Sequence, residues 1–139
     1  MNFKIRAAKK DDSKDISRLI MELAVYEKMP DRVMISYKEL ERDGFSSNPF
    51  FQCLVAEVPE ENKSKEGQGI GKSLMSKVAQ VGKEKQCVRL QLLMRDWNTP
   101  SLDFYVAKGA QDLTASEGWH FLRFDGEALD KLANEASID

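Results

Sequence analysis

The chain has 139 residues, of which 42% are hydrophobic and 32% are charged, as is usual for one folded domain and unlike a disordered chain. No apolar run approaches the roughly 20 residues that a membrane-spanning helix needs, so we expect no membrane contact. The 21 basic and 23 acidic side chains give a net charge of −2, which provides no long-range positive field for nucleic acid.

The first half of the sequence predicts two strands and two helices. Phe3 to Ala7 alternates as a short strand does, and an amphipathic helix begins at Asp12 or Ser13 and ends near Lys28. A capping box at Ser36 to Glu39 starts a second helix, for which Gly44 provides a left-handed stop. Residues 50–58 are apolar and β-branched and predict a buried strand. Residues 59–68 lack any period and predict a surface loop.

The second half predicts helices alternating with strands. An amphipathic helix begins at Ile70 and ends near Gln86, and residues 88–94 alternate as a half-exposed strand does. Thr99-Pro100 opens a further helix that Gly109 can end, residues 119–124 predict a last strand, and residues 127–136 predict a terminal helix. This order indicates a single domain, residues 1–139, of the α/β (α+β) class, with helices around a mixed sheet that contains at least one parallel pair.

A glycine loop, Gly67-Gln68-Gly69-Ile70-Gly71-Lys72, opens the helix at Ile70. Such loops expose backbone N–H groups to an anion at the positive end of the helix dipole. Both common nucleotide motifs miss by one residue: a Walker loop requires glycine where Glu66 stands, and the dinucleotide pattern requires two residues where only Ile70 separates the later glycines. A plain glycine turn into a helix explains the same residues equally well.

Besides the glycine loop, further sequence segments along nearly the whole chain carry information about the family, and together they form five blocks. They are Ile16–Ile20 with Glu22–Glu27; Asp43–Phe45, Asn48–Phe51 and Cys53–Val58; Gly67–Gly71; Asp96–Asn98, Pro100–Ser101, Phe104–Tyr105 and Gly109–Leu113; and Glu117–Phe121. In this order they resemble the diamine (spermidine/spermine) N-acetyltransferases of the GNAT superfamily. His120 makes the last block more similar to the thialysine branch. The glycine block is similar to the second half of the superfamily's pyrophosphate loop.

One departure from the family is an internal segment. In the family two further strands stand between the strand that ends at Val58 and the glycine loop, whereas here residues 59–66 lead directly to Gly67. The resemblance implies that these strands carry the water-activating glutamate, several acids that face the amine, and the bulged strand that holds the pantetheine arm. The leading arginine of the family's loop is also replaced, by Glu66. The expected fold is therefore a GNAT-like sheet that lacks two central strands.

The resemblance implies transfer of an acetyl group from acetyl-CoA to a primary amine. It assigns Gln68, Gly69, Ile70, Gly71 and Lys72 to the CoA diphosphate. Asn98 and Ser101 match further CoA contacts, and Tyr105 matches the acid that protonates the departing thiolate. Tyr26, Glu27 and Trp119 match residues that meet the amine.

Each of these residues also has a simpler structural explanation. Without the resemblance, Tyr105 would be interpreted as a core tyrosine on a helix that also buries Leu102. Asn98 and Ser101 suit a turn and a first helical turn, and Trp119 suits plain strand packing. His120 is more readily structural than catalytic.

Two functional hypotheses follow. The first is an active N-acetyltransferase for a polyamine or a thialysine-like amine; the second is an inactive shortened relative that acts as a binding or dimerisation partner. The family also implies a homodimer, and the start of the chain, without a signal-peptide pattern, predicts the cytoplasm. One histidine, with Cys53 and Cys87 in apolar runs, predicts neither a metal site nor a disulfide.

Overall fold

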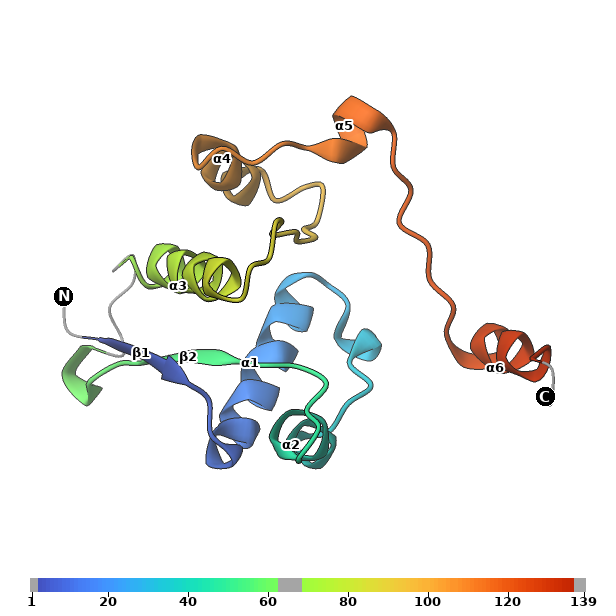
Figure 1. The fold of residues 1–139 in the computed structure, drawn as a ribbon, viewed down its shortest axis with the longest axis horizontal. Helices are drawn as coiled ribbons and strands as arrows, with labels where there is room; N and C mark the ends of the chain where they lie inside the picture. The colour runs from blue at the N-terminus through green and yellow to red at the C-terminus, as the bar shows by residue number, and fades with distance from the viewer. Residues whose placement is uncertain (1–2, 63–68, 137–139) are drawn as a thin grey trace. The chain divides into compact units, whose positions relative to one another are not determined.

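The computed structural model describes residues 3–62 and 69–136, which belong to two compact units, residues 1–93 and 94–139 (Figure 1). The first unit contains β1 (Lys4–Ala7), α1 (Ser13–Tyr26), α2 (Tyr37–Phe45), β2 (Leu54–Glu57) and α3 (Ile70–Glu84), with short 3₁₀ turns at Lys10–Asp12, Pro30–Arg32 and Glu60–Asn62. The second unit contains α4 (Thr99–Ala107), α5 (Leu113–Glu117) and α6 (Gly126–Asn134). This mixture of helices and a small sheet agrees with the predicted α/β (α+β) class.

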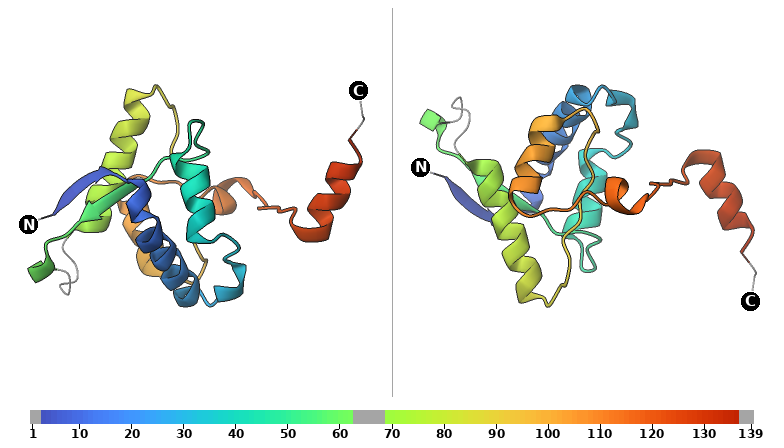
Figure 2. Two further views of the ribbon diagram at one scale, coloured as in Figure 1. Left: turned by 90° about the horizontal axis from the view of Figure 1, so that it is seen from below. Right: turned by 90° about the horizontal axis from the view of Figure 1, so that it is seen from above.

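The sheet of the first unit is a short antiparallel ribbon. β1 pairs with β2 in the register Lys4 to Glu57 through Ala7 to Leu54. Helix α3 lies on one side of this ribbon and α1 and α2 lie on the other, as Figures 1 and 2 show. In the described part of the chain, the buried hydrophobic side chains are only Ala24 and Leu40, so the three layers enclose a small core.

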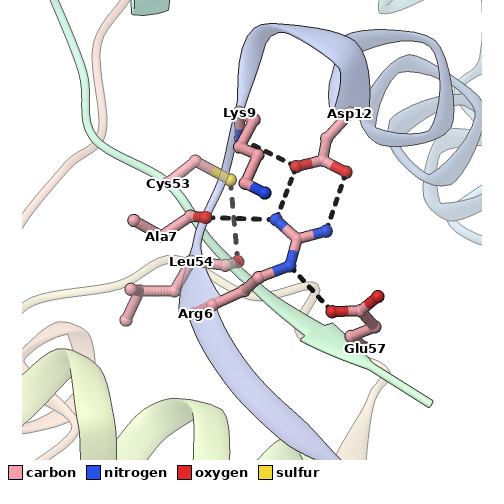
Figure 3. Close-up of polar contacts among 7 residues, drawn as sticks. All are labelled: Arg6, Ala7, Lys9, Asp12, Cys53, Leu54 and Glu57. Carbon is pink, nitrogen blue, oxygen red and sulfur yellow. Dashed lines mark hydrogen bonds and ion pairs between the residues drawn. The ribbon is translucent and has the colours of Figure 1, made fainter.

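Arg6 ties the ribbon to the start of α1 (Figure 3). Its two terminal nitrogens donate to both carboxylate oxygens of Asp12, at 2.8 and 3.1 Å, and its Nε donates to Glu57 at 3.0 Å. Asp12 also accepts the backbone N–H of Lys9 at 2.7 Å. The hydrogen bonds from Arg6 first, and then that from Lys9, lower the pKa of Asp12 to about 2. The bidentate geometry fixes where α1 leaves the end of β1.

Helix α2 begins as predicted but does not stop at Gly44. Ser36 accepts the N–H of Glu39 at 3.3 Å and donates its hydroxyl to the Glu39 carboxylate at 3.2 Å. Gly44 does not adopt the left-handed conformation, and the helix continues to Phe45. The predicted role of Gly44 was therefore wrong. The structure instead gives a steric reason for glycine at this position, because a Cβ at Gly44 would collide with the ring of Phe51.

The two later strands that the alternation predicts are not strands in the structure. Residues 88–94 and 119–124 carry no strand assignment, and within residues 3–62 and 69–136 the sheet has two strands with no parallel pair. A strand persists only when its backbone N–H and C=O groups pair with a neighbour. Among the described residues no strand pairs with either segment, and Val88 is 95% exposed.

Helix α5 was not predicted, although both of its ends carry local signals. The Asp112 carboxylate accepts the N–H groups of Thr114 and Ala115, at 3.2 and 3.4 Å. Gly118 ends the helix in the left-handed conformation, with φ of 70°. The helix is only five residues long, which is too short for an apolar period to reveal it.

Candidate functional site

The start of α3 presents open backbone donors. Gly69 precedes the helix in the left-handed conformation, with φ of 75°, and its carbonyl accepts the N–H of Ser73 at 3.0 Å to close the first turn. No described side chain caps this end. A Cβ built on Gly69 or on Gly71 would have no other described atom within 4 Å. An anionic group therefore has room to approach the N–H groups of Ile70, Gly71 and Lys72, which point out of the helix start.

Helix α3 begins at Ile70, as the sequence predicts, and four of the residues assigned to the glycine-loop site are described. Gly69 and Gly71 are exposed, Ile70 is half-buried, and Lys72 is exposed on the first turn. Gln68, also assigned to this site, lies outside the described residues. The arrangement suits an anionic group such as a phosphate, because the helix dipole and several N–H donors act on the same point and no described side chain caps them.

Tyr26 and Glu27, assigned to the amine, stand at the end of α1. Tyr26 is 57% exposed and Glu27 is half-buried. The helix closes with a Schellman motif, in which Met29 N–H donates to the Ala24 carbonyl at 2.7 Å and Lys28 N–H donates to the Val25 carbonyl at 3.0 Å. Lys28 holds the left-handed position of this motif, with φ of 60°, where glycine is usual.

Helix α4 carries three of the assigned residues on one short element. The sequence predicts Thr99, before Pro100, as the residue that caps this helix. In the structure the Asn98 side-chain carbonyl accepts the Ser101 N–H at 3.4 Å, so Asn98 is the cap and Thr99 is the first helical residue. Ser101 and Tyr105 follow one turn apart and lie on the same side of the helix. Tyr105 is half-buried, and its ring meets Phe104 edge-on at 5.4 Å.

The end of α4 also holds the backbone of Tyr105. The Tyr105 carbonyl accepts the Ala110 N–H at 3.0 Å in a second Schellman motif, with Gly109 in the left-handed position. The predicted role of Gly109 as the end of this helix is confirmed. The main chain around the tyrosine is therefore fixed at both ends of a nine-residue helix.

Trp119 is exposed beyond α5. Its side chain is 62% accessible, and the indole N–H donates to the Glu117 carboxylate at 2.8 Å. His120, next to it, is exposed as well. The assigned residues therefore divide between the two units: the glycine loop, Tyr26 and Glu27 belong to the first, and Asn98, Ser101, Tyr105 and Trp119 belong to the second.

The first unit also contains a cavity that the sequence did not reveal. It has a volume of about 730 Å³ and is mainly apolar. Its walls come from the ends of β1 and α2, the start of β2, the second half of α3 and residues 87–90. Cys53, which lines it, is a free thiol whose pKa is raised by burial. The signal that could have indicated an open space here is the pair of strands that, by the family resemblance, would follow residue 58.

Two other kinds of site receive no support from the described residues. Across residues 3–62 and 69–136, no three histidine, cysteine, aspartate or glutamate side chains gather in a way that could hold a metal ion. Over the same ranges, no helix has the length and apolarity needed to cross a membrane.

Comparison with known proteins decides the family. The model of the Acetyltransferase (GNAT) family matches residues 62–110. The thialysine N-epsilon-acetyltransferase of Bos taurus is 41% identical over 165 residues, which cover 94% of this chain and 97% of that enzyme. This chain belongs to the GNAT acetyltransferases. It is thus an N-acetyltransferase by family, and the family implies acetyl-CoA as co-substrate.

Two further similarities extend this result. The human spermidine/spermine N(1)-acetyltransferase-like protein 1 is 33% identical over 96% of this acetyltransferase chain, which matches 24% of that longer protein. The solved structure of an integron cassette protein from the mobile metagenome of V. cholerae has a TM-score of 0.68 at 22% identity, covering 97% of this chain and 99% of that one. The structural similarity shows the shared fold.

The bovine comparison also measures what this GNAT chain lacks. The alignment extends over 165 residues, to which this chain contributes about 131, or 94% of 139. About 34 positions of the relative therefore have no counterpart here. This number is enough for two strands of about five to six residues each with their turns.

Proposed function

We propose that this chain, with residues 1–139 acting as one domain, transfers an acetyl group from acetyl-CoA to a primary amine of a thialysine-like amino acid or a polyamine. The observation that carries the proposal is the 41% identity to the bovine thialysine acetyltransferase over nearly the full length of both chains. The human spermidine/spermine-like relative supports polyamines as the second substrate class.

The first requirement of this reaction is that the protein binds CoA. Gly69 and Gly71 leave space at the helix start where side chains would otherwise stand, and the first-turn N–H groups would donate to diphosphate oxygens. Lys72 adds a positive charge to the same turn, and Gln68 precedes it. Asn98 and Ser101 would contact other parts of CoA.

The second requirement is proton transfer on both sides of the acyl group. A primary ammonium with a pKa of about 10.4 is neutral in only about one of 2,500 molecules at pH 7, which costs roughly 4.6 kcal/mol. The departing thiolate, if it titrates near 8.5 as a cysteine does, needs a proton that a tyrosine hydroxyl can donate. Tyr105 is the candidate acid, and its fixed backbone on α4 would hold the hydroxyl in one place.

The acceptor amine is cationic before it reacts. Glu27 offers a carboxylate, and Tyr26 and Trp119 offer exposed aromatic faces that attract cations. We further propose a homodimer, as the resemblance implies, that acts in the cytoplasm.

A second candidate is an inactive relative that binds or dimerises with other subunits. The observation that favours it is the shortfall of about 34 positions together with the two-stranded sheet. By the family resemblance, the water-activating glutamate belongs to the strands that this chain lacks. Without such a base, most of the deprotonation cost of the amine remains in the reaction barrier.

A radiometric acetyl-transfer assay with thialysine and spermidine separates the two candidates. For the enzyme we expect turnover of at least one amine, and a loss of about 10²-fold or more in kcat for Tyr105→Phe. Tyr37→Phe is the matched control, since Tyr37 is also half-buried on a helix but has no assigned role. Absence of turnover with both amines, in a chain that melts cooperatively, would eliminate the enzyme and leave the binding partner.

A further inference from the structure

The cavity of the first unit is lined by the start of β2, by residues 87–90 and by α3. Its lining includes Cys53 and Leu54, where β2 begins, and Val88 and Leu90, which follow α3. Val78 and Ala79, in the second half of α3, also line it. The cavity is therefore lined by the start of a strand, by a segment whose sequence alternates as a strand does, and by part of a helix.

In the described residues, each of these two segments has at least one edge without a strand partner. β2 pairs with β1 on one edge only, and residues 88–93 belong to no ladder. Their side chains nevertheless alternate, with Val88, Leu90 and Leu92 on one side and Arg89 and Gln91 on the other, as in a strand with one apolar face. Unpaired strand backbone next to an apolar surface is the arrangement that accepts an added strand.

The number of residues that this chain lacks relative to the bovine enzyme indicates what could fill the cavity. The bovine relative has about 34 positions that this chain lacks, and a two-stranded hairpin of about five to six residues per strand fits within that length. The ladder stops after β2, and the family match begins at residue 62, just beyond it. A chain that turned back along the free edge of β2 would lead into this cavity.

We propose that this cavity binds a β-hairpin supplied by another polypeptide, with apolar side chains at alternate positions, which pairs with β2 and with residues 88–93 and completes the sheet. The hairpin donates and accepts the backbone hydrogen bonds that both segments lack, and its apolar side chains cover Val78, Leu90 and their neighbours. This interaction is independent of acetyl transfer, because a chain with no turnover would bind the hairpin equally well.

The test is calorimetric titration of the full chain with a synthetic peptide that contains the segment of the bovine enzyme without a counterpart here. We expect micromolar binding, a gain of β signal in far-ultraviolet circular dichroism and a higher melting temperature. Ala79→Glu, which places a charge at an exposed position of the cavity lining, should weaken binding more than tenfold. Gln80→Glu is the matched control, since Gln80 is exposed on the same helix outside the cavity, and it should bind as the wild type does.

Three results would overturn the proposal. The first is no binding by a chain that melts cooperatively. The second is equal binding of a scrambled peptide, which would mean unspecific attraction to an apolar surface. The third is a dimer of the chain alone that Ala79→Glu dissociates, which would mean that a second copy occupies the cavity.

Discussion

Replacing Gly71 by alanine should move stability and CoA affinity in opposite directions. Gly71 lies in the first turn of α3, and a Cβ there meets no other described atom within 4 Å, so the methyl group causes no steric strain in the protein. Alanine exceeds glycine in helix propensity by up to about 1 kcal/mol. For a chain of this length we expect the melting temperature to rise by about 2–4 °C.

The same methyl group should hinder the diphosphate. Cα–Cβ bonds of a helix tilt toward its N-terminus, so the added methyl of Gly71→Ala projects toward the region that an anion needs in order to reach the first-turn N–H groups. These contacts require about 2.9 Å between nitrogen and oxygen. We expect at least tenfold weaker CoA binding, which corresponds to about 1.4 kcal/mol. Gly69→Ala is the poorer variant, because its φ of 75° would add backbone strain.

Calorimetric titration with CoA, paired with thermal melts, measures both effects. Gly82→Ala is the control: it makes the same change eleven residues further along the same helix, where the added Cβ meets only the Cys87 Cβ at an ordinary 3.7 Å. We expect that control to retain wild-type CoA affinity. Unchanged affinity in Gly71→Ala, beside a raised melting temperature, would refute a diphosphate site at this helix start.

Three further predictions concern stability. Because the folded-state pKa of Asp12 is lowered to about 2, its carboxylate stabilises the fold above about pH 4, and this contribution is lost as the pH falls toward 2. Asp12→Asn, which weakens the bond to Arg6, should lower the free energy of unfolding by about 1–2 kcal/mol at pH 7. It should also make the melting temperature depend less on pH between pH 4 and 2. Calorimetric pH profiles that run parallel for the variant and the wild type would contradict this. Gly44→Ala should destabilise the wild type by up to about 2 kcal/mol, because the added methyl meets the Phe51 ring, but it should stabilise a Phe51→Ala variant. If urea unfolding shows that Gly44→Ala changes the free energy of unfolding in the same direction in both backgrounds, the ring contact is not the cause. Lys28→Gly should raise stability by about 0.5–1 kcal/mol by relieving a left-handed lysine, and a lower urea midpoint would reject that explanation.

The helices could be predicted because their signals are local. The capping box of Ser36 and Glu39 predicts the start of α2. The ends predicted for α1 and α3 lie within two residues of the observed helix ends. Lys28 and Gln86 hold the left-handed positions after α1 and α3. Neither is a glycine, so these two left-handed helix endings could not be predicted.

The sheet could be predicted only in part, because alternation does not reveal whether a partner exists. Residues 4–7 pair with residues 54–57, whereas residues 88–94 and 119–124 alternate in the same way but pair with no described strand. For the site, Gly69 and Gly71 indicated an open helix start, and the structure has one. Asn98 is assigned to CoA by the resemblance, and only the structure shows that its side chain also caps α4.

The exposed segment at residues 88–93 bears on how long the protein survives in a cell. Chaperones and proteases act on chains that display extended apolar backbone, and a fold with this feature in its native state is open to them without first unfolding. Val88 at 95% exposure and Leu93 at 69% belong to such a segment. We expect rapid turnover of the chain when it is produced alone, and an abundance that follows the supply of whatever covers these residues.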